Sequence, residues 1–176
     1  ISEQSDIKLL IIASDTDYLQ LCNENILLID LKMNNITDKW LIETNMSNKE
    51  YLLRKILIGD TSDNINCCTI NSLKLEYLNT NYNIKIRKNK NNIYKCTDKI
   101  ITQILAHLEL KSALFNYLEV NKNQNKNHEK NNTFVDLVKI LDFINLNIFN
   151  YNQLIIDFTY IPNYIKDDIV KQLKCL

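Results

Sequence analysis

Four aspartates stand in two short motifs, and their carboxylates can bind a metal ion if the fold brings them together. Asp15 and Asp17 follow an apolar run, and Asp60 and Asp63 follow the lone glycine of the chain, Gly59. Four carboxylates brought together repel one another and raise one another's pKa, and a bound divalent cation removes that cost. Carboxylate oxygens are hard ligands, which suit Mg²⁺ or Mn²⁺.

Each motif also has a simpler structural interpretation. An Asp-x-Asp motif after a strand, such as Asp15 and Asp17, is often only a helix N-cap with a turn residue. The segment from Asp60 to Asp63 can likewise be a helix terminus followed by a cap. Spacing alone favours the structural interpretation of both motifs.

The elements that must position these motifs are strands and helices in the first sixty residues. Residues 8–13 and 25–31 are continuous apolar runs, typical of buried strands of a parallel sheet with both faces covered. Residues 18–22 predict a short helix, and residues 36–41 predict a third strand. Residues 47–50 form a capping box, and the apolar spacing after it predicts an amphipathic helix that ends at the second acidic motif.

The later part of the chain has helical patterns. These cover residues 70–78, 98–117, 134–148 and a last helix from Pro162 to about residue 173, with a loop over 79–92. An Asn/Lys-rich tract at about 121–132 is typical of a mobile linker. The pattern predicts an α/β fold, with a partial parallel sheet in residues 1–60 and a helical extension in residues 61–176.

Composition bounds the protein class. The chain has 176 residues, of which 45% are hydrophobic, enough for a sizeable core. Its 21 basic and 21 acidic residues balance, so net charge gives no argument for a nucleic-acid partner. Five irregularly spaced cysteines favour a reduced, intracellular protein over a disulfide framework. No apolar run predicts a membrane span, and a first residue other than Met predicts that the chain begins inside a longer reading frame.

Two strings carry a resemblance to a known family. The string IIASDTDYLQL (11–21) resembles the 5′-nuclease superfamily, the flap endonucleases and 5′-3′ exonucleases, in which a strand ends in Asp-x-Asp and then Gln-Leu. The string ILIGDTSDNI (56–65) closely resembles the specific Gly-Asp-x-Ser-Asp-Asn-Ile motif of that family. Residues 154–162 resemble a stretch found in members from large DNA viruses. The resemblance is strong over residues 8–78 and thin beyond them.

The resemblance implies a fold, a reaction and a site. The fold would be a PIN-like or resolvase-like core followed by a helix-two-turn-helix-like region. Asp15, Asp17, Asp60 and Asp63 would be catalytic and would belong to a cluster that binds two Mg²⁺ or Mn²⁺ ions about 4 Å apart. The chain would hydrolyse DNA phosphodiesters at 5′ ends, flaps or RNA primers during replication or repair. We expect a monomer in the nucleus or at a viral replication site.

Two departures from the family limit this expectation. The remaining metal carboxylates of the family, and the Lys and Arg that steady the scissile phosphate, would lie before Ile1, so this piece alone is expected to be inactive. The family's glycine-rich turn that holds the DNA backbone is replaced by residues 65–72, which contain no glycine. Asn66 or Asn71 can supply the left-handed conformation that a turn needs.

Side chains can replace the main-chain contacts that such a turn would make. We hypothesise that four residues take over phosphate binding: Thr69, Asn71, Ser72 and Lys74. The densest basic stretch can also touch DNA phosphates, although a solvated loop is the favoured interpretation; it contains Lys85, Arg87, Lys88, Lys90 and Lys95.

Single residues outside these motifs have simpler interpretations. His107 is predicted to pack rather than to catalyse, and Trp40 is predicted to be part of the core. Tyr18 lies beside the first acidic motif, where it can approach a nucleotide.

Two other functions stay open at this point. One is a non-catalytic relative that keeps the fold and binds nucleic acid or a replication partner. The other is a PIN-like ribonuclease, against which the second acidic motif and the helical extension argue. The sequence does not distinguish exonuclease from flap cleavage or DNA from RNA, and it does not tell whether a sliding clamp is a partner.

Overall fold

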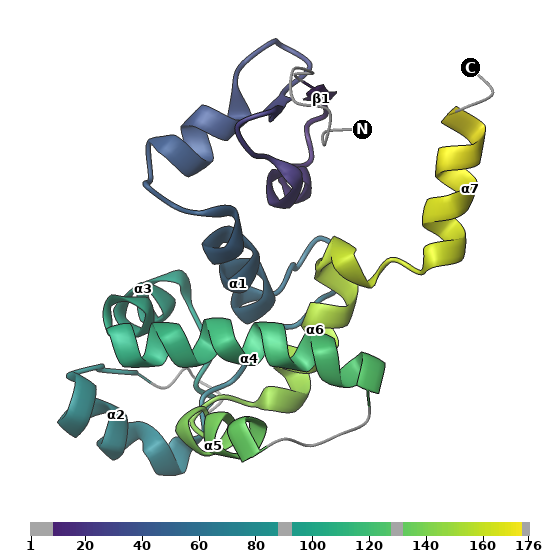
Figure 1. Ribbon diagram of the computed structural model, residues 1–176. Helices are drawn as coiled ribbons and strands as arrows, with labels where there is room; N and C mark the ends of the chain where they lie inside the picture. The colour runs from purple at the N-terminus through teal and green to yellow at the C-terminus, as the bar shows by residue number, and fades with distance from the viewer. Residues whose placement is uncertain (1–8, 88–92, 128–131, 174–176) are drawn as a thin grey trace.

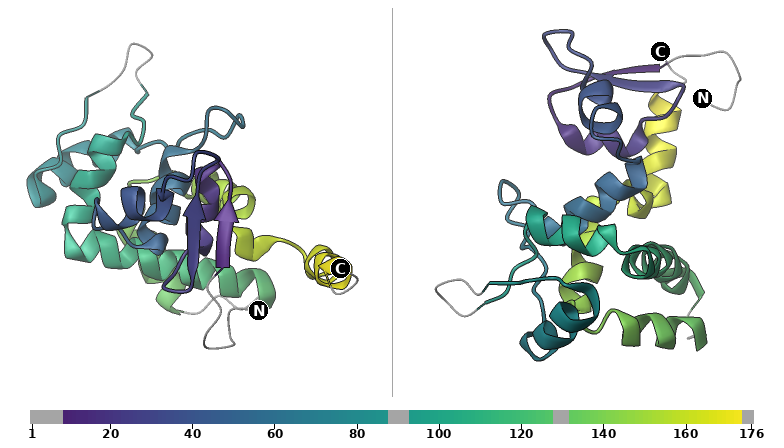
Figure 2. Two further views of the ribbon diagram at one scale, coloured as in Figure 1. Left: turned by 90° about the horizontal axis from the view of Figure 1, so that it is seen from above. Right: turned by 90° about the vertical axis from the view of Figure 1, so that its left-hand side faces the viewer.

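The chain folds as a mixed α/β protein in which helices predominate. The computed structural model describes residues 9–87, 93–127 and 132–173. Figure 1 shows a small part that contains the sheet, a larger helical part, and α1 (Asn48–Ile58) where the two meet. The right-hand view in Figure 2 shows the same division. The last helix, α7 (Asn163–Leu173), stands to one side of the helical part.

The sheet has two parallel strands within the described residues. β1 (Leu9–Ile12) pairs with β2 (Ile26–Ile29). Between them the chain passes through η1 (Thr16–Leu21), a 3-10 helix. The two strands and the short helix between them are confirmed as predicted.

The two strands of this sheet differ in how far their faces are covered. Leu19 of η1, Leu28 of β2 and Tyr51 of α1 form a small buried core on one face of the sheet. Leu10 and Ile12 of β1 are each 58% exposed. Within the described residues, the prediction that both faces of the strands are covered is therefore wrong for β1. In β2 the neighbouring Leu28 and Ile29, which point to opposite faces, are both buried.

A helical turn replaces the predicted third strand. η2 (Asp38–Ile42) is a short π-helical turn. The backbone N–H of Leu28 donates to Oγ1 of Thr37 at 2.8 Å, so a hydroxyl takes the hydrogen bond that a neighbouring strand would accept. Asn35 fixes the start of the turn, because its Oδ1 accepts the N–H of Asp38 at 3.1 Å.

α1 begins at the predicted cap. Oγ of Ser47 accepts the backbone N–H of Glu50 at 3.2 Å, which satisfies one of the free amides of the first turn. The Glu50 carboxylate pairs with Arg54 at 3.5 Å and with Lys111 at 2.8 Å. The apolar side chains of α1 join two cores: Tyr51 packs with the sheet, while four others, Leu52, Leu53, Ile56 and Leu57, pack with the helical part.

The helical part surrounds one large apolar core. In chain order its elements are η3 (Ser72–Lys74), α2 (Leu75–Tyr82), α3 (Asp98–Ala106), α4 (Leu108–Asn127), α5 (Asn132–Ile140), α6 (Leu146–Ile156) and η4 (Phe158–Tyr160). Helices α1, α3, α4 and α6 pack around fully buried side chains such as Ile104, Leu114 and Phe149. In the described ranges, no helix is both long and apolar enough to cross a membrane.

Helix boundaries differ from the predicted ones in four places. The helix expected over 70–78 begins at Leu75, after the 3-10 turn η3, and runs to Tyr82, inside the predicted loop. The long helix expected over 98–117 breaks at His107, whose extended backbone separates α3 from α4. α4 then continues to Asn127, so the predicted linker is helical up to that residue, and residues 128–131 lie outside the described ones. The helix expected over 134–148 is two helices, α5 and α6.

A side chain ties the early part of the chain to the late part. Nε2 of Gln20 donates to the carbonyl of Ile156 at 3.0 Å, and its Oε1 accepts the N–H of Phe158 at 2.9 Å. The ring of Tyr18 packs edge-on against that of Phe158, with centroids 5.9 Å apart. η1 is thereby fixed to the end of α6.

Candidate metal centre

Asp60 and Asp63 lie on a tight loop directly after α1. Asp60 and Ile65 exchange backbone hydrogen bonds of 2.9 and 2.7 Å, which close the loop. Oδ1 of Asp60 also accepts the N–H of Ser62 at 2.9 Å. The backbone of the loop therefore fixes both carboxylates relative to the end of α1.

Gly59 allows this loop to pack against itself. It ends α1 with φ +72° and ψ −168°, a region that glycine alone adopts readily. A Cβ at this position would lie 2.5 Å from the carbonyl oxygen of Ile65 and 2.6 Å from the backbone of Asn66. The retention of a glycine here thus has a direct steric cause.

The left-handed residue of this segment is not one of those predicted. Asn64 has φ +59°, a conformation that asparagine tolerates better than most residues. The prediction that Asn66 or Asn71 supplies it is wrong, because neither has a positive φ.

Asp15 and Asp17 have different roles in η1. Oδ1 of Asp15 accepts the N–H of Asp17 at 2.8 Å, which makes Asp15 the N-cap of η1. Asp15 is exposed, while Asp17 is partly buried. The simpler interpretation, an N-cap, thus describes the geometry of Asp15.

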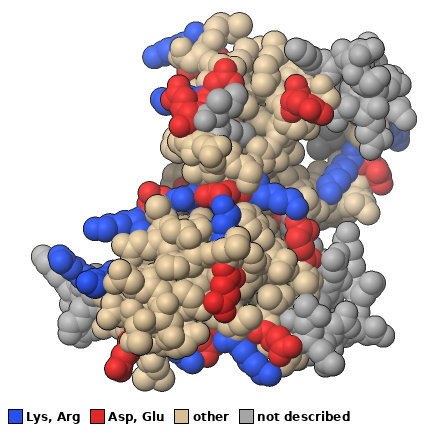
Figure 3. Space-filling view, turned by 60° about the vertical axis from the view of Figure 1, so that its left-hand side comes forward, with Lys and Arg blue, Asp and Glu red and all other residues tan. Residues whose placement is uncertain are grey.

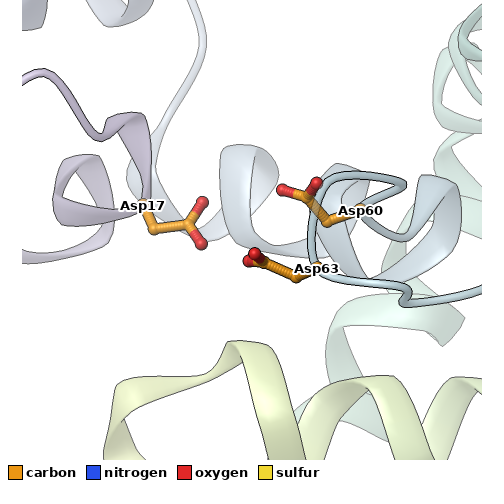
Figure 4. Close-up of side chains that lie close together, drawn as sticks. All are labelled: Asp17, Asp60 and Asp63. Atoms are coloured by element: carbon orange, nitrogen blue, oxygen red, sulfur yellow. The ribbon is translucent and has the colours of Figure 1, made fainter.

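Three of the four predicted carboxylates come together. One carboxylate oxygen from each of Asp17, Asp60 and Asp63 lies within 4.8 Å of the others. Figure 4 shows the three carboxylates facing one another, Asp17 from η1 and the other two from the loop after α1. Asp15 is outside this group.

Lys55 supplies the counter-charge of this cluster. Its Nζ lies 2.6 Å from Oδ1 of Asp17 and 2.7 Å from Oδ2 of Asp60. The three side chains are only 18–20% exposed, so water screens these ion pairs incompletely. One ammonium bridges the two segments that carry the cluster.

The ion pairs shift the pKa of two groups. Burial alone would lower the pKa of the Lys55 ammonium, but its hydrogen bonds to Asp17 and Asp60 outweigh burial and raise it. The hydrogen bonds from Lys55 and from the Ser62 hydroxyl lower the pKa of Asp60 to about 2. Asp60 is therefore a carboxylate, and Lys55 an ammonium, at neutral pH.

Lys55 was not among the residues predicted for the site. Its position was visible in the sequence, because it lies one helical turn after Tyr51 and five residues before Asp60. The apolar spacing of α1 places Lys55 at the edge of the buried stripe, where a long side chain can reach either way.

The donor set of the cluster fits a divalent cation. Three carboxylates from two separated segments offer hard oxygen ligands. Mg²⁺ and Mn²⁺ prefer ligands of this kind. Their summed charge of about −3 exceeds the single charge of Lys55, so the cluster keeps an excess of negative charge. A cation bound here would compete with Lys55 for Asp17 and Asp60.

The four residues predicted to bind phosphate are mostly engaged within the fold. The backbone of Thr69 bridges to Lys95, and its carbonyl accepts the N–H of Asn145 at 2.9 Å. Oδ1 of Asn71 caps η3, where Ser72 is exposed. Lys74 forms an ion pair of 2.6 Å with Asp142. Their role in phosphate binding stays a prediction.

Comparison of the chain with family models, with curated proteins and with solved structures found no match. The arguments about function therefore start from the geometry of the acidic cluster and from the two motifs that carry it.

Proposed function

We propose that this chain belongs to a divalent-metal-dependent nuclease of the 5′-nuclease type, which hydrolyses DNA phosphodiesters. One observation carries the proposal: Asp17 and the pair Asp60 and Asp63, far apart in the sequence, lie close enough to share one cation. These are the residues whose motifs resemble the Asp-x-Asp and Gly-Asp-x-Ser-Asp strings of that family. The geometry supports one cation site, and a second ion remains part of the proposal.

The finer fold assignment is also a proposal. The parallel strands β1 and β2, with Asp15 and Asp17 just beyond the carboxyl end of β1, support a PIN-like core. The short elements η3 and α2 after the acidic loop support a region derived from a helix-two-turn-helix.

The residues of the cluster have distinct proposed roles. Asp17, Asp60 and Asp63 hold the cation, which when bound activates water and stabilises the leaving oxygen. The ammonium of Lys55, released from the carboxylates, lies beside the site and neutralises a non-bridging oxygen of the scissile phosphate. Hydrolysis breaks a P–O bond and leaves a 5′-phosphate and a 3′-hydroxyl.

Lys55 also favours a second candidate, a non-catalytic nucleic-acid-binding relative. An ammonium already occupies Asp17 and Asp60, and such a fixed ion pair can replace a metal as the structural link between the two segments. Metal binding distinguishes the two candidates, because only the nuclease needs the cation. Cleavage of RNA in preference to DNA would instead identify a PIN-like ribonuclease.

Titration of the protein with Mn²⁺, followed by isothermal calorimetry, tests the metal site. We expect Asp17→Asn, Asp60→Asn and Asp63→Asn each to weaken binding at least tenfold, because each removes a charged oxygen ligand. Asp15→Asn should leave the affinity unchanged, and Asp136→Asn, on the exposed surface of α5, is the matched control. Equal affinity in all five proteins would end the proposal.

Cleavage of a 5′-flap DNA substrate by the full-length protein in Mg²⁺ tests the reaction. We expect a 5′-phosphate product from the unmodified protein and none from Asp60→Ala, with circular dichroism unchanged. Metal binding without cleavage of any DNA or RNA substrate would favour the non-catalytic candidate.

A further inference from the structure

A cavity of about 550 Å³ on the helical part is lined by four basic side chains. Its walls consist of Lys85, Arg87, Lys95 and Lys99, together with Ile93, Thr97, Ile100 and Gln103. All four basic side chains are exposed to solvent. Figure 3 shows several Lys and Arg side chains on one side of the helical part, and a mixed row of basic and acidic side chains at the boundary with the sheet part.

The backbone fixes the segments that carry these cations. Lys85 and Arg87 follow α2 next to Ile84, which is buried and whose N–H donates to Leu78. Lys95 lies beside the buried Cys96, whose N–H donates to the carbonyl of Cys68 at 2.9 Å. The basic side chains are thus held on both sides of one cavity rather than on an unattached loop.

The charges of this cavity lack acidic partners. Within the described residues, none of the four basic side chains forms an ion pair, whereas Lys49, Lys74 and Lys111 do. Asp98, the acid that adjoins Lys99, pairs with Arg54 on α1 at 3.0 Å. Four like charges around one cavity repel one another, so a polyanion that enters it is strongly favoured.

An unused acceptor lies in the wall of the same cavity. Oε1 of Gln103 is buried and has no hydrogen-bond partner in the part of the chain that the structure describes. A buried acceptor normally has a donor. Phosphate groups of a ligand would neutralise the cations, while the Gln103 oxygen itself lies beneath the cavity surface.

Arg54 of α1 pairs with Asp98, the residue that directly precedes the cavity residue Lys99. Arg54, which holds Asp98 and lies 3.2 Å from Oγ1 of Thr102 on α3, is the neighbour of Lys55 in sequence. Helix α1 therefore contacts the acidic cluster through Lys55 and the helix that carries Lys99 through Arg54. The apolar faces of Ile93 and Ile100 in the wall suit the sugars between phosphates.

We propose that this cavity binds the sugar-phosphate backbone of a nucleic acid, as a second contact in addition to the metal centre. The inference rests on the proposed function for the nature of its ligand. It assigns sequence-independent binding to Lys85, Arg87, Lys95 and Lys99, because contacts to phosphates carry no base information.

Fluorescence anisotropy with a labelled single-stranded oligonucleotide, in EDTA, tests the inference. One variant changes all four basic residues of the cavity to Gln. A matched control changes four exposed lysines elsewhere to Gln, and these are Lys32, Lys39, Lys139 and Lys171. We expect the affinity of the first variant to fall at least tenfold. Its slope of log affinity against log salt should become shallower by about 0.7 for each phosphate that the variant no longer neutralises.

Three outcomes would overturn the inference. Equal losses of affinity in both variants would show that net charge alone attracts DNA. An unchanged affinity in the cavity variant would show that the cavity is not used. The third outcome is that inorganic pyrophosphate competes as strongly as the unlabelled oligonucleotide at equal phosphate concentration. That result would assign the cavity to small phosphates instead.

The proposal for the metal centre can be wrong while the proposal for this cavity holds. If the cavity variant binds DNA more weakly while no variant of the acidic cluster changes Mn²⁺ binding, the backbone site stands and the nuclease proposal falls.

Discussion

Lys55 on α1 and Asp17 on η1 form an ion pair of 2.6 Å that joins the helical part of the protein to its sheet part. The same ammonium lies 2.7 Å from Asp60, so it holds the acidic cluster together where a metal ion would otherwise do so. Two positive charges cannot share these carboxylates without cost, since a cation and the ammonium repel each other.

We therefore predict that Lys55→Met binds Mn²⁺ about tenfold more tightly, equivalent to about 1.4 kcal/mol. Cleavage should fall in the same variant if Lys55 neutralises the scissile phosphate. Calorimetry and single-turnover cleavage measure the two effects separately. Lys49→Met, at an exposed pair with Glu119, is the control. Weaker Mn²⁺ binding in Lys55→Met would mean that the ammonium shapes the site rather than competes for it.

Gly59→Ala should destabilise the protein by more than about 2 kcal/mol, because its backbone region excludes side chains. The added Cβ would also meet the backbone of Ile65 and Asn66 within 2.6 Å. Urea denaturation followed by circular dichroism measures the change. Asn83→Gly, at another left-handed position, should change stability by less than about 1 kcal/mol. A stable Gly59→Ala protein would show that the loop can rearrange.

Asn152→Leu should cost about 2 kcal/mol or more of unfolding free energy. The fully buried amide of Asn152 donates to the carbonyls of Ile56 at 2.8 Å and Asn66 at 2.7 Å. Leucine removes both donors and, in the described part of the chain, leaves the Ile56 carbonyl with only the weak Cys68 thiol donor at 3.6 Å. Asn147→Leu, on the exposed side of the same helix, is the matched control and should change stability little. Comparable effects of the two substitutions would contradict the importance of these bonds.

Stability should fall as pH rises above about 9, in part because of Cys68. Burial, with a smaller contribution from Cys67, raises the pKa of the Cys68 thiol to about 12. As pH rises, the Cys68 thiol of the unfolded chain loses its proton first, near the ordinary pKa of 9.0. The stabilisation that comes from keeping the folded thiol protonated is therefore fully present below pH 9 and is lost between that pKa and the folded-state pKa of about 12. The stability of Cys68→Ala should depend less on pH than that of the unmodified protein, by about 1 kcal/mol between about pH 8 and pH 10 in urea titrations. A Cys67→Ala protein should keep most of this dependence of stability on pH.

Local signals in the sequence predicted the elements around the candidate site. The capping side chain of Ser47, the apolar run of β1 and the position of Gly59 each depend on near neighbours, and each is confirmed. The convergence of Asp17 with Asp60 and Asp63 was implied by the family resemblance rather than by spacing.

Contacts distant in sequence account for most of what was missed. The predicted third strand does not form, because the Thr37 hydroxyl accepts the hydrogen bond from the Leu28 N–H at the edge of β2. Lys55 lies at the edge of an amphipathic stripe, where spacing does not define whether a long side chain turns toward solvent or toward an acid. Trp40 was predicted to be in the core, yet it is 41% exposed and touches Tyr51 edge-on.

The paired hydrogen bonds of Gln20 have a consequence for the order of assembly. They join residues 136 and 138 positions apart, so η1 cannot reach its final place until the end of α6 has left the ribosome. Because synthesis starts at the N-terminus, Asp17 is made early, but its position is fixed only late. Contacts between residues so far apart in the sequence also slow folding. A nascent chain would thus expose its acidic side chains long before they can act together.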